Sequence, residues 1–198
     1  MREYGYKGKV EVVDNGSDFA GNIPVEQLRR SARDKLRLPS DEFMFLFVGQ
    51  HIWEKNLEFL LEALAEIRTL PFRMYFIGSG YAASELRRKT EDLYLTDKVI
   101  FMGSITERER LKLYYAAADL FLFPSLYDNA PLVVREAAAL HTPSLLIKGS
   151  TSAEVIHDSV NGFLSDNSVT AYASRISQLL ETPQLIAEAG EAASHSIA

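Results

Sequence analysis

The chain has 198 residues, of which 47% are hydrophobic and 24% charged, so it is long enough to bury the core of one large domain. Its formal net charge of −6 argues against a nucleic-acid partner and against an anionic membrane surface. The absence of cysteine excludes disulfides and thiolate metal sites, and the four histidines show no metal-ligand spacing.

The start of the chain and its apolar runs bear on its expected location. The first 16 residues lack the apolar run of a signal peptide, and no stretch approaches the length of a membrane-spanning helix. We therefore expect a cytoplasmic location, with peripheral membrane association open for a longer parent protein. The last residues stop in helix-compatible sequence without a capping signal, which indicates a truncated chain.

The first part of the chain is typical of a lead-in segment. Residues 10–19 predict one short strand followed by a turn-rich run. Residues 23–36 predict a helix with Pro24 in its first turn. We expect a lead-in at residues 1–22, one folded domain at 23–182 and a helical segment at 183–198.

Short apolar runs then alternate with longer amphipathic ones. Strands are predicted at residues 43–49, 72–78, 98–103, 119–124, 143–147 and 162–165. Helices are predicted at residues 54–69, 82–95, 106–118 and 131–140, from about 152, and at 168–181. Because the strands are apolar on both faces and each precedes a helix, we expect a doubly wound, Rossmann-like parallel sheet of about six strands with helices on both faces. Ligands of such sheets bind beyond the carboxyl ends of the strands.

The junction between the fourth strand and its helix holds two carboxylates, Asp128 and Glu136. Since Pro131 is tolerated only in the first helical turn, Asp128 belongs to the loop and Glu136 to the second turn. The helix start offers free backbone N–H groups, and two hydroxyl-binding carboxylates around such an anion site suit a nucleotide sugar without metal or nucleophile. The alternative is that Asp128 and Asn129 cap the helix while Glu136 is solvated.

Four segments in order resemble motifs of the family 4 glycosyltransferases, which have the GT-B fold. They are VVDNGSDF (12–19), FVGQHIWEKNLEFLLEAL (47–64), PSLYDNAPLVVREAAAL (124–140) and GSTSAEVI…NGFL (149–164). The resemblance implies one half of a GT-B enzyme, namely the C-terminal donor-binding domain of a retaining enzyme that transfers a hexose from a UDP- or GDP-sugar to an unknown acceptor. It implies no cofactor and no metal. It also implies that the N-terminal acceptor-binding domain is missing, so that this chain alone transfers little.

The resemblance assigns roles to individual residues. It implies that Asp128 contacts hydroxyls of the donor sugar and that Glu136 binds the ribose hydroxyls. It implies that Lys55 neutralises the donor diphosphate, so that Lys55 and Asp128 are the expected catalytic residues. The backbone N–H groups of Leu132 and Val133 match positions that contact the donor at the helix start.

Two positions depart from the family pattern. Gln50 stands where the family has arginine, which removes a fixed charge and predicts weaker diphosphate binding or compensation from another cation, for which His51 is a candidate. Pro131 has no N–H to give, which puts one backbone contact in doubt. The alternative for Lys55 is a solvated lysine near a helix start. Trp53 is expected either to line the cleft or to pack in the core.

The remaining expected contacts lie on neighbouring strand ends. Gly78 and Gly80 are interpreted as room for the nucleotide, with a tight turn as the alternative. Val99 and Phe101 belong to a run that resembles V-x-F-x-G, whose main chain meets the nucleobase in the family. Residues 150–154 follow the fifth strand, where family members close the donor site, with helix capping as the alternative for the first two of them.

Two other function classes stay open. A non-catalytic nucleotide-sugar-binding module would keep Glu136 and lose the phosphate cation. A sugar-nucleotide epimerase or phosphorylase-like relative with the GT-B fold would show its own catalytic acid or cofactor lysine, and the sequence shows neither motif.

Overall fold

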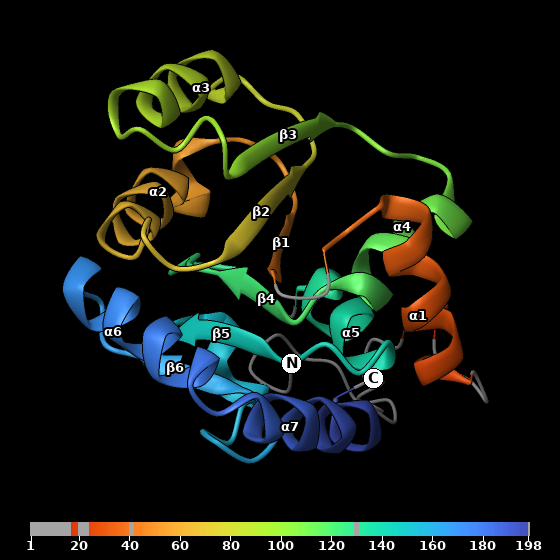
Figure 1. The fold of residues 1–198 in the computed structure, drawn as a ribbon. Coiled ribbons are helices and arrows are strands. Elements are labelled where there is room, and N and C mark those ends of the chain that lie inside the picture. The colour runs from red at the N-terminus through yellow and green to blue at the C-terminus, as the bar shows by residue number, and fades with distance from the viewer. Residues whose placement is uncertain (1–16, 20–23, 40–41, 129–130, 198) are drawn as a thin grey trace, which may run out of the picture.

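A computed structural model describes residues 17–19, 24–39, 42–128 and 131–197. Its centre is a parallel six-stranded sheet in the order β3-β2-β1-β4-β5-β6 (Figure 1). The strands are β1 (Phe43–Val48), β2 (Phe72–Ile77), β3 (Val99–Gly103), β4 (Leu120–Phe123), β5 (Ser144–Ile147) and β6 (Phe163–Ser165). The expected fold class is confirmed, because each predicted strand is present within a residue of its expected bounds.

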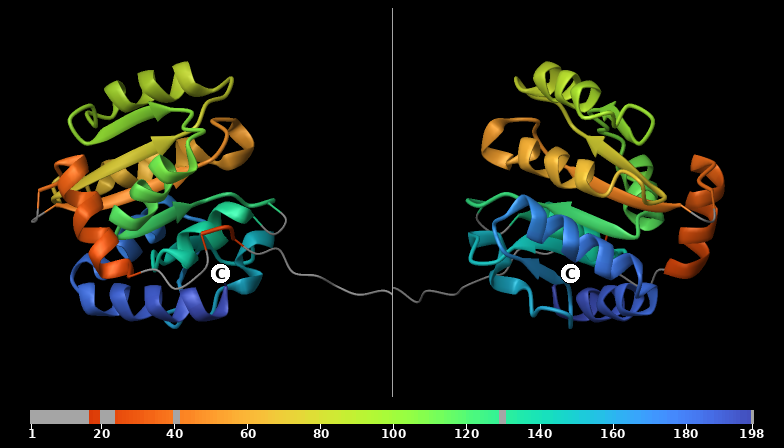
Figure 2. Two further views of the ribbon diagram at one scale, coloured as in Figure 1. Left: turned by 90° about the vertical axis from the view of Figure 1, so that its right-hand side faces the viewer. Right: turned by 60° about the vertical axis from the view of Figure 1, so that its left-hand side comes forward.

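Helices cover both faces of the sheet. They are α1 (Val25–Leu36), α2 (Leu57–Glu66), α3 (Ala83–Asp92), α4 (Arg108–Ala117), α5 (Leu132–Ala139), α6 (Val169–Leu180) and α7 (Pro183–Ser196). Figures 1 and 2 show α2, α3 and α6 on one face, and α1, α4 and α5 on the other. Helix α7 packs against α5 and α6. Within the described residues, no helix combines the length and apolarity that crossing a bilayer requires.

The strands are buried because both of their faces are covered. Every residue of β4 and β5 is buried, and in β1 only the first residue is half-buried. This burial explains why the strands are continuous apolar runs rather than alternating ones. On the carboxyl side of β1, Phe47 stacks on Phe123 of β4 with ring centroids 6.0 Å apart. The aromatic packing fixes the strand ends from which the loops of the site begin.

The helix predicted at residues 54–69 is interrupted at Asn56. This residue has a φ of 58°, which ends the 3-10 turn η2 (Trp53–Lys55) and precedes α2. Asparagine adopts this left-handed conformation more readily than most residues. Its side chain donates from Nδ2 to the carbonyl oxygen of Pro124, 3.2 Å away in the loop after β4. The prediction of one continuous helix was therefore wrong, and the break separates Lys55, the last residue of η2, from α2.

The strand order reverses between β1 and β4, which is the switch point of the sheet. The loops after these two strands diverge to opposite faces, yet they contact each other at their base. Ser125 Oγ donates to the carbonyl oxygen of Glu54 at 3.4 Å. A second 3-10 turn, η3 (Thr151–Val155), joins them from the end of β5. Ligands of doubly wound sheets bind at this place.

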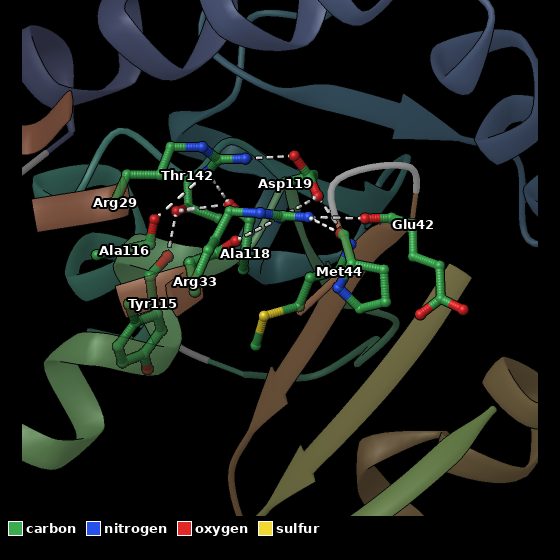
Figure 3. A network of polar contacts seen from close by, with 11 residues as sticks. Arg29, Arg33, Glu42, Met44, Tyr115, Ala116, Ala118, Asp119 and Thr142 are labelled. Atoms are coloured by element: carbon green, nitrogen blue, oxygen red, sulfur yellow. Dashed lines mark hydrogen bonds and ion pairs between the residues drawn. The ribbon is translucent and has the colours of Figure 1, made fainter. Parts of the chain in front are cut away.

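Helix α1 is fastened at the opposite edge of the sheet by a polar network (Figure 3). Arg29 and Arg33 both form ion pairs with Asp119, which immediately precedes β4. Asp119 also accepts from the main-chain N–H of Met44 in β1 at 2.7 Å. The two guanidinium groups donate further to the main-chain carbonyls of Pro39, Glu42, Ala116, Ala117 and Ala118.

The lead-in and the end of the chain are described in part. Residues 18 and 19 lie in a turn, while the strand predicted just before residue 17 lies outside the described residues. Asn129, expected as a possible cap, also lies outside them. Residues 183–196 form helix α7.

Candidate functional site

Lys55 and Asp128 meet across the switch point as an ion pair. Lys55 ends η2 after β1, and Asp128 lies in the loop after β4. The main-chain N–H of Asp128 donates to Thr151 Oγ1 at 2.8 Å, which ties this loop to η3. The two charged side chains are 20% and 19% exposed, so a ligand at the strand ends can reach both. The structure thus brings together the two residues expected to be catalytic.

Glu136 is only 9% exposed, although it is a helical acid. Its Oε2 accepts from the hydroxyl of Tyr115 at 2.8 Å, and its Oε1 forms an ion pair with Arg108 Nη2 at 2.8 Å. Burial holds the pKa of Tyr115 well above its usual range, with the Glu136 charge acting in the same direction. Tyr115 therefore stays a hydroxyl donor at neutral pH. Glu136 is not the solvated residue of the alternative interpretation.

The start of α5 carries no side-chain cap among the described residues. Its N-cap position is Pro131, whose backbone is extended, with a φ of −65° and a ψ of 118°. No side-chain oxygen of a described residue accepts a hydrogen bond from the first turn. The carboxylate of Asp128 pairs with Lys55 instead of capping the helix. Leu132, the first residue of the helix, is 52% exposed and Val133 is half-buried. The first turn therefore lies at the surface.

A hollow of about 320 Å³ adjoins Glu136. It is lined by Ser17, Asp18, Arg108, Leu132 and Glu136. Arg108 Nε donates to Asp18 Oδ2 at 3.0 Å, and this contact holds the pKa of Asp18 below and that of Arg108 above the ordinary values. The hollow thus joins the start of α5 to the described part of the lead-in. Its volume is at the low end of the range for small-molecule pockets, which begins at about 300 Å³.

Sequence reasoning missed Arg108 and Tyr115. Both belong to α4, where an exposed arginine and an aromatic residue fit an ordinary amphipathic pattern. Only the packing of α4 beside α5 places them against Glu136. No local signal in the sequence identifies them, because their partner follows a strand and a loop later.

Gln50 and His51 follow β1 and have opposite environments. Gln50 is exposed, whereas His51 is 2% exposed among the rings of Phe47, Phe76 and Phe101. Burial lowers the pKa of His51, and the nearby charge of Arg87 lowers it further. A neutral imidazole results at neutral pH, so His51 is not the cation that replaces the arginine of the family motif.

Gly78 and Gly80 allow the loops after β1 and β2 to cross in contact. A Cβ atom at Gly78 would lie 1.8 Å from the carbonyl oxygen of Gly49, and one at Gly80 would lie 2.3 Å from that of His51. The main chain also bonds there, because the N–H of His51 donates to the carbonyl of Ser79 at 3.0 Å. This close approach is enough to require glycine at both positions, and it comes from a contact between two loops rather than from a tight turn, because residues 78–80 form no turn.

The other expected contact residues are spread over the sheet and its loops, and Val99, the first residue of β3, lies at the amino end of that strand. Val99 is 7% exposed and Phe101 is half-buried, with the guanidinium of Arg87 4.7 Å from its ring centroid. Trp53 is 45% exposed and borders a hollow of about 180 Å³ with residues of α2 and α3, so it is not a core residue. Glu154 is exposed on η3.

The chain is similar to known glycosyltransferases in sequence. The profile of the family described as "Glycosyl transferases group 1" matches residues 29–196. D-inositol 3-phosphate glycosyltransferase 2 of Catenulispora acidiphila is 32% identical over 204 residues, covering 96% of this chain and 47% of the relative. The match to an uncharacterized glycosyltransferase of Methanocaldococcus jannaschii covers only 40% of the length of that relative. The chain thus spans less than half the length of these curated relatives.

Two solved structures share the fold. Sucrose-phosphate synthase of Thermosynechococcus elongatus is 26% identical with a TM-score of 0.79, covering 93% of this chain and 46% of that one. Anabaena HepE, solved in complex with UDP-glucose, is 22% identical with a TM-score of 0.74, covering 93% of this chain and 52% of that one. At that identity the second likeness concerns the fold alone.

Proposed function

Because the chain belongs to the group 1 glycosyl transferases, we propose that it is the donor-binding half of a retaining enzyme that transfers a hexose from a nucleoside-diphosphate sugar. The resemblance drawn from the motifs is confirmed at the level of the family. The observation that carries the finer proposal is the pairing of Lys55 with Asp128 at the switch point, together with the burial of Glu136 on the helix that follows the loop of Asp128. Acceptor binding would then belong to a domain outside this chain.

The diphosphate would lie against Lys55 and the first turn of α5. An ammonium group has three N–H donors, so Lys55 can keep Asp128 and still donate to phosphate oxygens. The N–H groups of Leu132 and Val133 in the first turn, with the positive end of the helix dipole, favour the same charge. Together they would stabilise the leaving diphosphate as the bond to the sugar breaks, which needs no metal.

The sugar and the ribose would be held by the two carboxylates. Asp128, partly exposed beside the loop, would accept from hydroxyls of the sugar. Glu136 would accept from the ribose, because its carboxylate borders the hollow beside the helix start. Hydrogen bonds to an ionised acceptor are roughly twice as strong as neutral ones, so these two contacts would dominate recognition of hydroxyls.

The nucleobase would lie over the ends of β2 and β3. The main chain of Val99 to Phe101 and the loop segment at Gly78 and Gly80 border that place in our proposal. Exposed Gln50 would contribute a neutral hydrogen bond to the diphosphate, weaker than the charged fork of an arginine. We test UDP first, because HepE, which shares the fold, was solved with UDP-glucose. The lead-in at 1–22, domain at 23–182 and helical segment at 183–198 remain the proposed organisation.

The test is isothermal titration of UDP, GDP and UDP-glucose into the chain and its Glu136→Gln variant. Glutamine retains the shape and one hydrogen bond to Tyr115 or Arg108, so the fold is kept. We expect Glu136→Gln to weaken binding of the preferred nucleotide by about 10- to 100-fold, the size of one or two lost charge-assisted hydrogen bonds. Glu91→Gln, which neutralises an exposed acid on α3, is the matched control.

Two results would contradict the proposal. One is a chain that binds none of the three nucleotides, and the other is a Glu136→Gln variant that binds as the wild type does. The half-enzyme interpretation has its own assay, because acceptor positioning supplies much of the rate of a transfer. Efficient, acceptor-selective transfer by the 198-residue chain would overturn it.

A further inference from the structure

Arg108, the first residue of α4, is the centre of the cluster beside Glu136. Its guanidinium forms ion pairs with both Asp18 and Glu136 and lies 4.2 Å from the ring centroid of Phe19. The side chain is 42% exposed and borders the 320 Å³ hollow. Neither the sequence motifs nor the proposed function uses this residue.

The side chains around Arg108 also contact one another. Phe19 is 3% exposed and packs edge-on against Tyr115, with ring centroids 6.0 Å apart at 64°. Tyr115 in turn donates to Glu136, and Arg108 joins Glu136 to Asp18. Phe19, Tyr115 and Glu136 are thus each held by two other members of the cluster, and Arg108 contacts Phe19, Glu136 and Asp18. A guanidinium suits this position because its planar fork donates in two directions at once.

Counting the described residues alone, the contacts to Glu136 leave half of its carboxylate free. A carboxylate has about four lone-pair sites, two on each oxygen. Tyr115 occupies one side of Oε2 and Arg108 one side of Oε1. One acceptor site remains on each oxygen, which matches the two neighbouring hydroxyls of a ribose. If Arg108 were absent, Oε1 would lose the contact that fixes the rotation of the carboxylate.

We propose that Arg108 is a positioning residue of the donor site, which orients Glu136 so that its two oxygens accept together from the 2′- and 3′-hydroxyls of a ribose. This inference rests on the proposed function and deepens it. Arg108 acts through Glu136, so its effect is on selection between ribonucleotides and 2′-deoxyribonucleotides. Asp18 supports it by holding the other edge of the guanidinium.

The experiment measures dissociation constants of UDP and 2′-deoxy-UDP by titration calorimetry. Arg108→Met keeps the length of the side chain and removes every donor. Arg108→Lys keeps the charge and loses the fork. Arg110→Met removes an exposed arginine from the same helix and is the matched control. Circular dichroism confirms that each variant is folded.

We expect wild type to prefer UDP over 2′-deoxy-UDP by about 10-fold, the size of one strong hydrogen bond. Arg108→Met lowers this preference for UDP over 2′-deoxy-UDP to about two-fold or less, mainly by weakening the binding of UDP. Arg108→Lys restores part of the ratio, and Arg110→Met leaves it unchanged. If Arg108→Met does not fold, Asp18→Asn serves in its place and lowers the ratio by a smaller factor.

Three results would overturn the inference while leaving the proposed function intact. The ratio could stay as in wild type, or both ligands could weaken equally, as a general charge effect would cause. UDP could also bind more tightly to Arg108→Met, as expected if Arg108 merely blocked the hollow. A wild-type chain that binds no UDP would instead remove the proposed function and this inference together.

Discussion

Two arginine–carboxylate clusters lie at opposite ends of the strands, one at the amino ends and one at the carboxyl ends. Both are built from arginine and carboxylate side chains. At the amino end of β4, Asp119 pairs with Arg29 and Arg33 of α1 (Figure 3). At the carboxyl edge, Glu136 of α5 pairs with Arg108 of α4. Both carboxylates are largely buried, and both clusters border a hollow. Charge and burial therefore do not separate a structural cluster from a ligand site here.

The two clusters differ in whether their hydrogen-bond partners are main-chain or side-chain groups. Asp119 accepts from the main-chain N–H of Met44, and Arg33 donates to main-chain carbonyls of three residues. Among the described residues, the polar partners of the Glu136 carboxylate are side chains, namely the hydroxyl of Tyr115 and the guanidinium of Arg108. Bonds to the main chain fix the path of the chain, whereas side-chain contacts can rearrange around a ligand. We infer that the first cluster supports the fold and the second supports binding.

The largest expected effect is the loss of stability in Asp119→Ala. The variant leaves two guanidinium groups and the N–H of Met44 without their shared acceptor, which should lower the free energy of unfolding by about 3 kcal/mol. Urea denaturation measures it, with the exposed Asp97→Ala as control, expected within about 0.5 kcal/mol of wild type. UDP affinity of the folded fraction should not change. A loss of affinity without loss of stability would reverse the assignment of the two clusters.

A smaller effect is expected at Lys55, on binding rather than folding. Lys55→Met removes the cation proposed to bind the diphosphate. It should weaken the binding of UDP by about 10-fold while leaving the binding of uridine unchanged. Stability should fall by less than about 1 kcal/mol, because the ion pair with Asp128 keeps contact with solvent. Lys148→Met, on an exposed lysine after β5, is the control. Equal losses for UDP and uridine would contradict a phosphate contact.

The smallest effect concerns His51, which is part of neither cluster. Its pKa is lowered by burial, so below the unfolded-state value of about 6.5 the unfolded chain binds more protons than the native one. Stability from His51 is therefore present above about pH 6.5 and is lost as the pH falls below it. Burial lowers the pKa of His141 as well, with the same sign.

His51→Leu should consequently lose less stability than wild type between pH 7.5 and pH 5. Denaturant titrations at the two pH values measure the difference. His157→Gln, at an exposed histidine, should behave as wild type. An unchanged pH dependence in His51→Leu would contradict this, because it would mean that folding does not lower the pKa of the imidazole.

Several parts of the site were predictable because they depend on neighbours in the chain. Pro131 separates Asp128 from the helix of Glu136 whatever surrounds them, and the structure has this arrangement. The two loops that carry Lys55 and Asp128 follow strands on either side of the switch point, so their meeting follows from strand order. The break at Asn56 was not predicted, because its left-handed backbone is stabilised by a bond to the distant Pro124.

By itself, the sequence determined that this chain forms a doubly wound parallel sheet and which loops carry the candidate residues. Apolar periodicity reports burial, and burial on both faces is enough to specify that architecture. Only the tertiary structure decided that Glu136 is buried and that Arg108 and Tyr115 hold it. It also decided that Gly78 and Gly80 are required by a crossing of two loops. Such contacts join elements far apart in the chain, and their geometry is set by helix packing, to which no local pattern of residues corresponds.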